Sequence, residues 1–198
     1  MYAAPYDPKR PVICFDELPY QLLADTREPM AMKPGAPERM DYEYERMGTC
    51  NVFMFFQPLR GWRRLLVRDT KTKMDFAECM KVLADEWFPE ADEIRVVQDN
   101  LNTHTPVSFY DRFDPSEARR LTKKLDFHYT PKHGSWLNMA EIEFSVLSRQ
   151  CLDQRIPTKE MVKRMGSVWA KQRTERKAMI NWRFSTEDAR VKLKRLYP

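Results

Sequence analysis

The chain has 198 residues, of which 42% are hydrophobic and 32% are charged. This length suits one domain with a packed core, and the composition excludes a wholly disordered chain. No apolar run approaches the roughly 18 residues that span a bilayer, and the chain starts without an apolar signal segment. The four cysteines are widely separated without a C-x-x-C motif, which excludes a zinc finger and predicts free thiols in a reducing cytoplasm.

The charge is distributed unevenly. The net charge is +5, yet residues 101–198 contain 20 Lys and Arg against 11 Asp and Glu, whereas residues 1–100 contain 14 against 18. A basic half beside an acidic half is typical of a protein that binds a polyanion and also carries carboxylate chemistry. The alternative is a solvated charged surface, and charge alone does not decide between the two.

Strand-like segments dominate the first third of the chain. The apolar run Pro11–Asp16 predicts a buried strand that ends in an acid, and Tyr20–Ala24 predicts a second strand. Residues 25–48 are polar and rich in proline, which predicts a loop or a long hairpin excursion. Cys50–Gln57 and Trp62–Arg68 then predict two strands joined by a turn.

Helical and strand patterns alternate in the middle of the chain. Lys73–Phe88 has apolar residues at helical spacing, and Ile94–Asp99 is a short strand-like run that again ends in an acid. Ser116–Leu125 predicts a helix and Phe127–Tyr129 a strand. This order predicts a mixed α/β fold, in which antiparallel strands come first and helices cross over between the later strands.

Helices are expected in the last third of the chain. Asn138–Cys151 has helical periodicity, and Thr158–Met179 predicts a longer basic helix. Ser185–Asp188 has the pattern of a capping box that opens a final helix over Thr186–Leu196. Most of the basic residues of the C-terminal half therefore lie on predicted helices.

Two acids stand at the ends of separate predicted strands. Asp16 closes the first strand and Asp99 closes the strand after the first long helix, and strand ends present side chains to a site outside the sheet. Adjacent carboxylates repel unless divalent cations lie between them, and carboxylate oxygens select Mg²⁺ or Mn²⁺. Two such ions about 3.5–4 Å apart can promote attack on a phosphodiester. The alternative is that both residues are ordinary turn-forming acids.

A third carboxylate is needed to complete such a site. The helix Asn138–Cys151 supplies Glu141 and Glu143, which point about 200° apart, so that only one can face the site. The two flank the apolar stripe of the helix on opposite edges. Periodicity therefore leaves the choice between them open.

Three motifs in combination resemble the D-D-E transposases of the mariner-type superfamily, in particular their bacterial insertion sequence 630 branch. The motifs are Cys14–Glu17, Val97–His104 and Tyr129–Glu143, and the resemblance extends from about residue 10 to the C-terminus. Any one of these motifs alone would carry little weight.

The resemblance implies which carboxylates are catalytic and bind metal. The first catalytic Asp of the family falls on Asp16 and the second on Asp99. The family's L-N-x-x-E motif aligns with residues 137–141, which selects Glu141 rather than Glu143.

The resemblance also implies residues that support these carboxylates or contact DNA. Asn100 and His104 match a D-N-x-x-x-H element, and His133 and Asn138 match an H-x-S-W-L-N element. Glu17 follows Asp16 on the opposite face of the strand and is either a supporting or a structural residue. A satisfied structural histidine is an equal alternative for His104.

Basic residues of the C-terminal helix are candidates for contacts with DNA phosphates, since each neutralised phosphate releases counterions. A solvated basic face is the alternative. The candidates are Lys159, Lys163, Arg164, Lys171 and Arg173.

The fold implied by the resemblance is a ribonuclease-H-like α/β fold, a mixed sheet flanked by helices with a basic helical C-terminal extension. We expect a linker at residues 1–10, a catalytic domain at 11–153 and a basic helical part of the same domain at 154–198. The helix-turn-helix region that usually precedes the first Asp is expected to be missing.

The implied activity is that of a two-metal transposase using Mg²⁺, with Mn²⁺ as a substitute. It cleaves DNA ends and then transfers the strand, usually to a TA target. The implied partners are the terminal inverted repeats and target DNA, bound by a homodimer in the bacterial cytoplasm at the nucleoid. The alternatives are a catalytically silent DNA-binding remnant and another ribonuclease-H-like nuclease.

Overall fold

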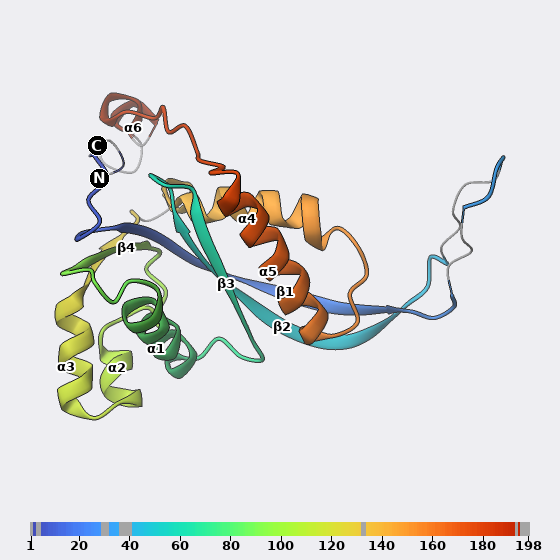
Figure 1. Ribbon diagram of the computed structural model, residues 1–198, viewed down its shortest axis with the longest axis horizontal. Helices are drawn as coiled ribbons and strands as arrows, with labels where there is room; N and C mark the ends of the chain where they lie inside the picture. Colours follow the sequence, from blue (N-terminus) through green and yellow to red (C-terminus); the bar gives the residue numbers. More distant parts are fainter. Residues whose placement is uncertain are drawn as a thin grey trace.

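A computed structural model describes residues 2, 5–28, 32–35, 41–131, 134–192 and 194. A five-stranded sheet in the order β3-β2-β1-β4-β5 lies at its centre (Figure 1). The strands are β1 (Val12–Asp25), β2 (Tyr44–Gln57), β3 (Trp62–Arg68), β4 (Ile94–Gln98) and β5 (Leu125–Tyr129). The first three pair antiparallel, whereas β4 pairs parallel with both β1 and β5, which confirms the predicted mixed sheet.

Strand β1 is a single long strand, so the prediction of two separate strands at Pro11–Asp16 and Tyr20–Ala24 is wrong. Because β4 pairs only with Val12–Cys14, Pro19 lies where β2 is the one neighbouring strand, and a residue without an N–H is tolerated there. A β-bulge between Gln21 and Leu23 then shifts the register of β1 against β2. Beyond the bulge the two strands continue as a projecting arm, which confirms the predicted hairpin excursion (Figure 1).

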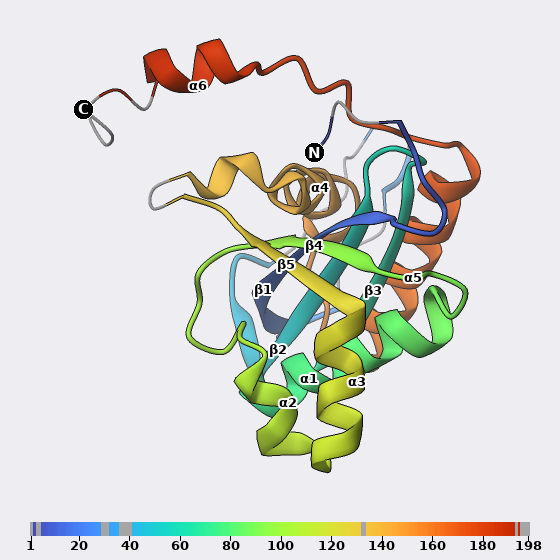
Figure 2. The ribbon, with the colours of Figure 1, turned by 90° about the vertical axis from the view of Figure 1, so that its left-hand side faces the viewer.

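Both faces of the sheet are covered by helices, which explains the continuous apolar run in β2. Phe53 and Phe55 belong to one core cluster, whereas Val52, Met54 and Phe56 belong to the other. Figure 2 shows the two helical layers on opposite sides of the sheet. The first cluster is covered by α1 (Lys73–Val82), α2 (Val107–Arg112) and α3 (Pro115–Lys124), and the second by α4 (Met139–Leu147) and α5 (Lys159–Glu175).

The helices of the first layer agree with the sequence except for one. Helix α1 continues into a π-helical turn, η1 (Leu83–Trp87), so the predicted helix at 73–88 is confirmed. Helix α3 begins at its N-cap Asp114, whose carboxylate accepts hydrogen bonds from two backbone N–H groups. Helix α2 was not predicted, because six residues are too few to show a period.

The second layer contains the helix that carries both candidate glutamates. A 3₁₀ turn, η2 (Ser135–Leu137), precedes α4, and a π-helical turn, η3 (Ser148–Leu152), extends it. Helix α5 has the predicted start but ends before Lys177, which adopts a left-handed conformation with φ 49°. Helix α6 (Thr186–Lys192) follows the predicted capping box, in which Ser185 and Asp188 exchange hydrogen bonds.

The end of α5 lies directly against the β2–β3 turn. A Cβ atom at Gly61 would come 2.9 Å from the backbone carbon of Lys177, so this approach requires glycine. Among the described helices, none is long and apolar enough to cross a membrane.

Candidate active site

The sheet brings Asp16 and Asp99 to the same region. Asp16 lies on β1, on the same face as Val12 and Cys14, and this face is covered by α4. Asp99 directly follows the last residue of β4, which runs parallel to β1 and pairs with it. The prediction that Asp16 ends a strand is wrong, because β1 continues to Asp25, whereas Asp99 does follow the end of β4. The two acids nevertheless belong to neighbouring strands that pair with each other.

The pKa of Asp16 shows that three carboxylates act on one another. Burial raises the pKa of Asp16 to about 7, and the backbone N–H of Glu17 opposes this by donating a hydrogen bond. The negative charges of Asp99 and Glu141 raise the pKa further, whereas His104 lowers it. The three candidate acids are thus close enough to repel electrostatically.

Several carboxylate oxygens of these acids have no hydrogen-bond partner among the described residues. On Asp16 the N–H of Glu17 occupies Oδ1 and leaves Oδ2 unbound. On Asp99, Oδ1 accepts hydrogen bonds from Leu101 and His104, and Oδ2 is unbound. Glu141 is half-buried, and neither of its oxygens has a described partner. Unbound oxygens on mutually repelling acids are what a cation would neutralise.

A buried histidine links Asp99 to Glu17. His104 lies 2.7 Å from Asp99 through Nδ1 and 2.9 Å from Glu17 through Nε2, and its side chain is 1% exposed. Burial lowers the pKa of His104, but the hydrogen bonds to Asp99 and Glu17 outweigh it and raise the pKa to about 9. Both ring nitrogens can therefore donate at neutral pH. The same contact lowers the pKa of Asp99.

Further contacts hold His104 and Glu17 in place. Phe15 and Phe76 pack against the ring of His104, and Lys71 lies 3.4 Å from the second oxygen of Glu17. The structure thus places Glu17 and His104 where they orient Asp99, rather than on the surface where DNA would reach them.

The two asparagines of the motifs hold the backbone around the site. Asn138 is buried, caps α4 by accepting from the N–H of Ala140, and donates to the carbonyl of Phe15 at 2.7 Å. It therefore joins the start of α4 to β1 and is not available for DNA. Asn100 donates to the carbonyl of Thr130 and braces the loop after β4, as expected.

Glu143 has a different environment from Glu141. Its carboxylate lies 2.9 Å from Arg63 of β3 and 3.0 Å from Arg173 of α5. The side chains of Glu143 and Arg63 are 1% and 0% exposed. Because Arg63 is buried with it, Glu143 is committed to an ion triad in the interior, which leaves Glu141 as the glutamate of α4 that faces Asp16.

The predicted phosphate contacts on α5 separate into two groups. Arg173 is engaged by Glu143, which contradicts its expected role at the surface, and Lys159 is paired with Asp69 at 2.5 Å. Lys171 makes a loose exposed pair at 3.9 Å, while Lys163 and Arg164 are exposed without an ion pair among the described residues. The prediction for His133 lies outside the described residues.

The sequence was compared with known families and structures. It matches the DDE superfamily endonuclease family over residues 11–163, more than half of the chain. The chain belongs to this family. No curated protein sequence matches the DDE endonuclease chain.

Solved structures that resemble this chain include three Mos1 transposase complexes. The first is a paired-end complex with the left transposon end, with a TM-score of 0.55 and 16% identity over 84% of this chain and 50% of the other. The second is a mariner paired-end complex with Mn, with a TM-score of 0.54 and 16% identity over 87% of this chain and 54% of the other. The third is a strand transfer complex, with a TM-score of 0.52 and 14% identity over 84% of this chain and 52% of the other. The chain thus spans about half the length of these proteins. The likeness establishes a ribonuclease-H-like fold, as the sequence predicted.

The donor chemistry of the DDE endonuclease site fits a hard divalent cation, since the three acids offer only oxygen atoms. Among the described residues, however, no three His, Cys, Asp or Glu side chains stand in an arrangement that could hold a metal ion. Asp99 is turned toward His104 in this arrangement. Binding a cation would therefore require the carboxylates to rotate toward one another.

The raised pKa of Asp16 gives a prediction for stability. Asp16 ionises above pH 4 in the unfolded chain but only near pH 7 in the folded one, so folding loses free energy as the pH rises between these values. Asp16→Asn should therefore be more stable than wild type above pH 7, by at most about 4 kcal/mol, and equally stable near pH 4. Urea unfolding at pH 4 and pH 8 with a chelator measures this. A variant with no gain at pH 8 would contradict the raised pKa of Asp16, whose main cause is burial.

Proposed function

We propose that this chain is the catalytic domain of a transposase of the insertion sequence 630 type, which cleaves transposon ends and transfers the strand. The observation that supports this most directly is the Asp16 carboxyl, which experiences the charges of both Asp99 and Glu141. Among the described residues no Lys or Arg side chain forms an ion pair with any of the three, and of the three His104 contacts Asp99 alone, so a bound cation would offset the repulsion that remains.

Asp16, Asp99 and Glu141 are the residues that would hold two Mg²⁺ ions, with Mn²⁺ as a substitute. The metal, when bound, supplies activation of the attacking oxygen and stabilisation of the leaving oxygen of a phosphodiester. The protein contributes the backbone position of each acid: β1 carries Asp16, the capped start of α4 carries Glu141, and Asp99 follows β4. His104 holds the Asp99 carboxylate in the orientation from which it would rotate to bind metal.

Double-stranded DNA is the proposed substrate, in the form of terminal repeats and target DNA bound by a homodimer. Support comes from the fold, since structures that resemble it include two paired-end complexes of Mos1. Lys163 and Arg164, exposed on α5, are the proposed phosphate contacts, together with the basic C-terminal half.

The test is nicking of supercoiled plasmid DNA by this chain in Mg²⁺ or Mn²⁺. We expect activity in wild type and a loss of at least about 100-fold in Asp99→Asn, equivalent to about 2.7 kcal/mol of barrier. Equal nicking by both proteins would remove the enzymatic proposal. Calorimetry without a heat of Mn²⁺ binding, together with salt-sensitive DNA retention, would instead support a silent DNA-binding remnant.

A further inference from the structure

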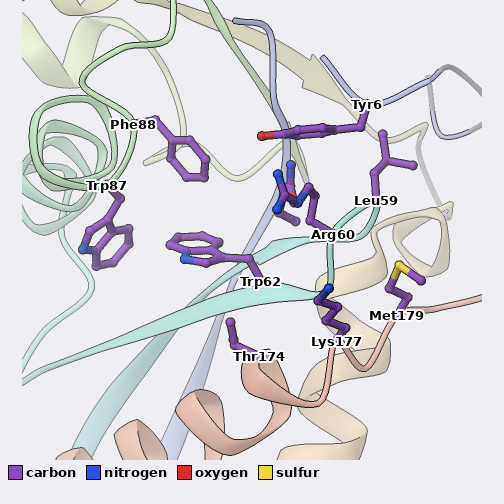
Figure 3. A pocket seen from close by; sticks show the side chains of 10 residues that line it. Tyr6, Leu59, Arg60, Trp62, Trp87, Phe88, Thr174, Lys177 and Met179 are labelled. Carbon is purple, nitrogen blue, oxygen red and sulfur yellow. The ribbon is translucent and has the colours of Figure 1, made fainter. Parts of the chain in front are cut away.

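A pocket of about 450 Å³ lies at the end of the sheet where β1 begins. Its walls come from the β2–β3 turn, the end of η1 and the end of α5 (Figure 3). Phe56, next to Gln57 at the end of β2, pairs with Cys14 near the start of β1, whereas Asp99 follows the end of the parallel strand β4. The pocket therefore lies toward the start of β1, whereas Asp16 lies further along this strand, opposite Met54, and none of the three acids lines the pocket.

The lining carries positive charge without any acid. Of the residues around the pocket, Arg60 and Lys177 are cationic and none is Asp or Glu. Neither cation forms an ion pair with a described residue, and the guanidinium of Arg60 lies 5.0 Å from the ring centre of Tyr6, which holds it over the pocket. These charges are available for an anion.

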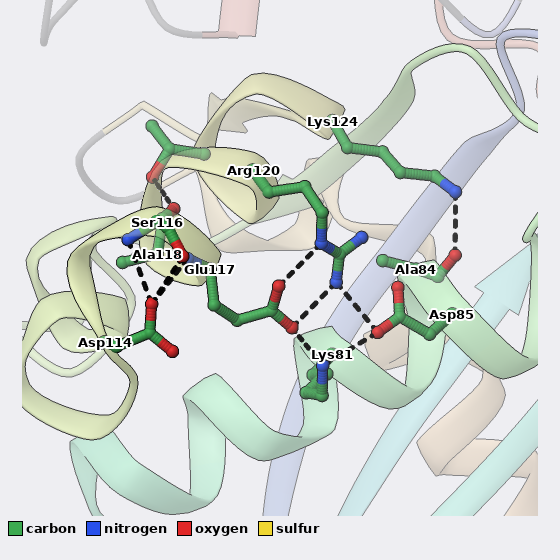
Figure 4. A network of polar contacts seen from close by, with 10 residues as sticks. Lys81, Ala84, Asp85, Asp114, Ser116, Glu117, Ala118, Arg120 and Lys124 are labelled. Carbon is green, nitrogen blue, oxygen red and sulfur yellow. Dashed lines mark hydrogen bonds and ion pairs between the residues drawn. The ribbon is translucent and has the colours of Figure 1, made fainter.

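A second charged groove shows the contrast. Beside α1 and α3, Lys81 and Arg120 are both paired with Asp85 and Glu117, so their charges are already neutralised (Figure 4). Arg60 and Lys177 thus differ from Lys81 and Arg120 in that no described acid neutralises their charges.

Aromatic rings form the other side of the pocket. Trp62 packs edge to face against Trp87 at 5.6 Å and against Phe88 at 5.0 Å, and all three are half-buried (Figure 3). Tyr6 lies across the space from this group. Rigid ring faces beside free cations are the elements with which proteins bind unpaired bases and their phosphates.

A buried amide adds a polar group to the lining. Gln57 is 2% exposed, and its side-chain nitrogen has no hydrogen-bond partner among the described residues. A buried amide donor without a partner is costly, and a ligand with an acceptor would offset that cost. A nucleotide base would pack against the aromatic rings, a carbonyl of the base would accept a hydrogen bond from Gln57, and the phosphate would lie near Arg60 and Lys177.

We propose that this pocket binds a nucleotide with an unstacked base, either free or as part of a single DNA strand. The volume lies within the range of small-ligand pockets. The site is separate from the three acids and does not depend on metal, so its test is made in the presence of a chelator.

The experiment measures binding of a fluorescein-labelled thymine hexanucleotide by anisotropy. Arg60→Gln combined with Lys177→Gly removes both cations, and glycine suits the left-handed backbone at Lys177. We expect this pair to weaken binding at least tenfold. The control, Lys33→Gln with Arg46→Gln, removes the same charge from exposed positions outside both the pocket and the basic C-terminal half, and should weaken binding less than twofold. Equal weakening by both pairs would mean general attraction and would overturn the proposal.

Two further measurements test recognition of the base. Trp62→Leu should weaken binding at least fivefold, while Trp62→Tyr, which keeps a ring, should restore most of it. Thymidine monophosphate, whose base carries the carbonyl acceptors, should displace the hexanucleotide at far lower concentration than inorganic phosphate. If the nucleoside monophosphate and inorganic phosphate displace the hexanucleotide at the same concentration, the pocket is a plain anion site and the proposal is rejected. Equal affinity for the hexanucleotide and for blunt duplex DNA would also reject it. If the monophosphate displaces the hexanucleotide as expected and the hexanucleotide binds no more tightly than the monophosphate, the ligand is a free nucleotide.

Discussion

Glu141→Gln is expected to abolish metal-dependent DNA cleavage while leaving the fold intact. The carboxylate of Glu141 has no hydrogen-bond partner among the described residues, so replacing it with the neutral amide of glutamine breaks no described contact and leaves the stability of the fold unchanged. It also removes one of the charges that raise the pKa of Asp16. We expect a loss of at least about 100-fold in plasmid nicking, because one of three metal ligands is gone.

Two readouts are needed for this variant. Calorimetry with Mn²⁺ should show weaker binding than in wild type, and urea unfolding should show unchanged or slightly higher stability. Full nicking activity in Glu141→Gln would remove Glu141 from the site, whatever the outcome for Asp16 and Asp99.

Glu143→Gln is expected to do the reverse and destabilise the protein by about 3–5 kcal/mol. The loss of this charge leaves Arg63 buried without a counter-ion and breaks the link from α4 to β3 and α5. The sequence alone predicts a mild effect on activity at this position, and the buried triad changes that expectation to a large effect on stability. Urea unfolding measures it.

Glu141→Gln is the matched control for Glu143→Gln, since the two carry the same chemical change on one helix two residues apart. A second control replaces both Arg63 and Glu143 with methionine, which removes the charges together and should recover most of the lost stability. If Glu143→Gln unfolds at the same urea concentration as wild type, the triad does not hold α4 to the sheet.

The elements of this fold were largely predictable because their patterns are local. The apolar run of β2 and the helical spacing of α1 are properties of neighbouring residues. The errors arose where contacts between distant parts of the chain determine the extent of an element. Two strands were expected at residues 11–16 and 20–24, but β1 runs unbroken through Pro19, which is tolerated because β4 pairs only with the first residues of β1.

The candidate site was predictable to a smaller extent. The positions of Asp16 and Asp99 after strand-like runs indicated the site, and the resemblance to a family selected Glu141. The role of Glu143 was not predictable, because its partners Arg63 and Arg173 come from other elements, and a basic strand or helix residue looks like a surface residue in sequence. One signal was present: Arg63 occupies an inward position on the strand that follows the β2–β3 turn.

The β-bulge between Gln21 and Leu23 has a consequence for how chains of this kind diverge. A one-residue slip of β1 against β2 would carry Asp16 to the opposite face of the sheet. The bulge lies between Asp16 and the projecting arm, so a residue gained or lost in the arm can be taken up there while Asp16 stays opposite Met54. Insertions and deletions can therefore accumulate in the arm over evolution without displacing the acid.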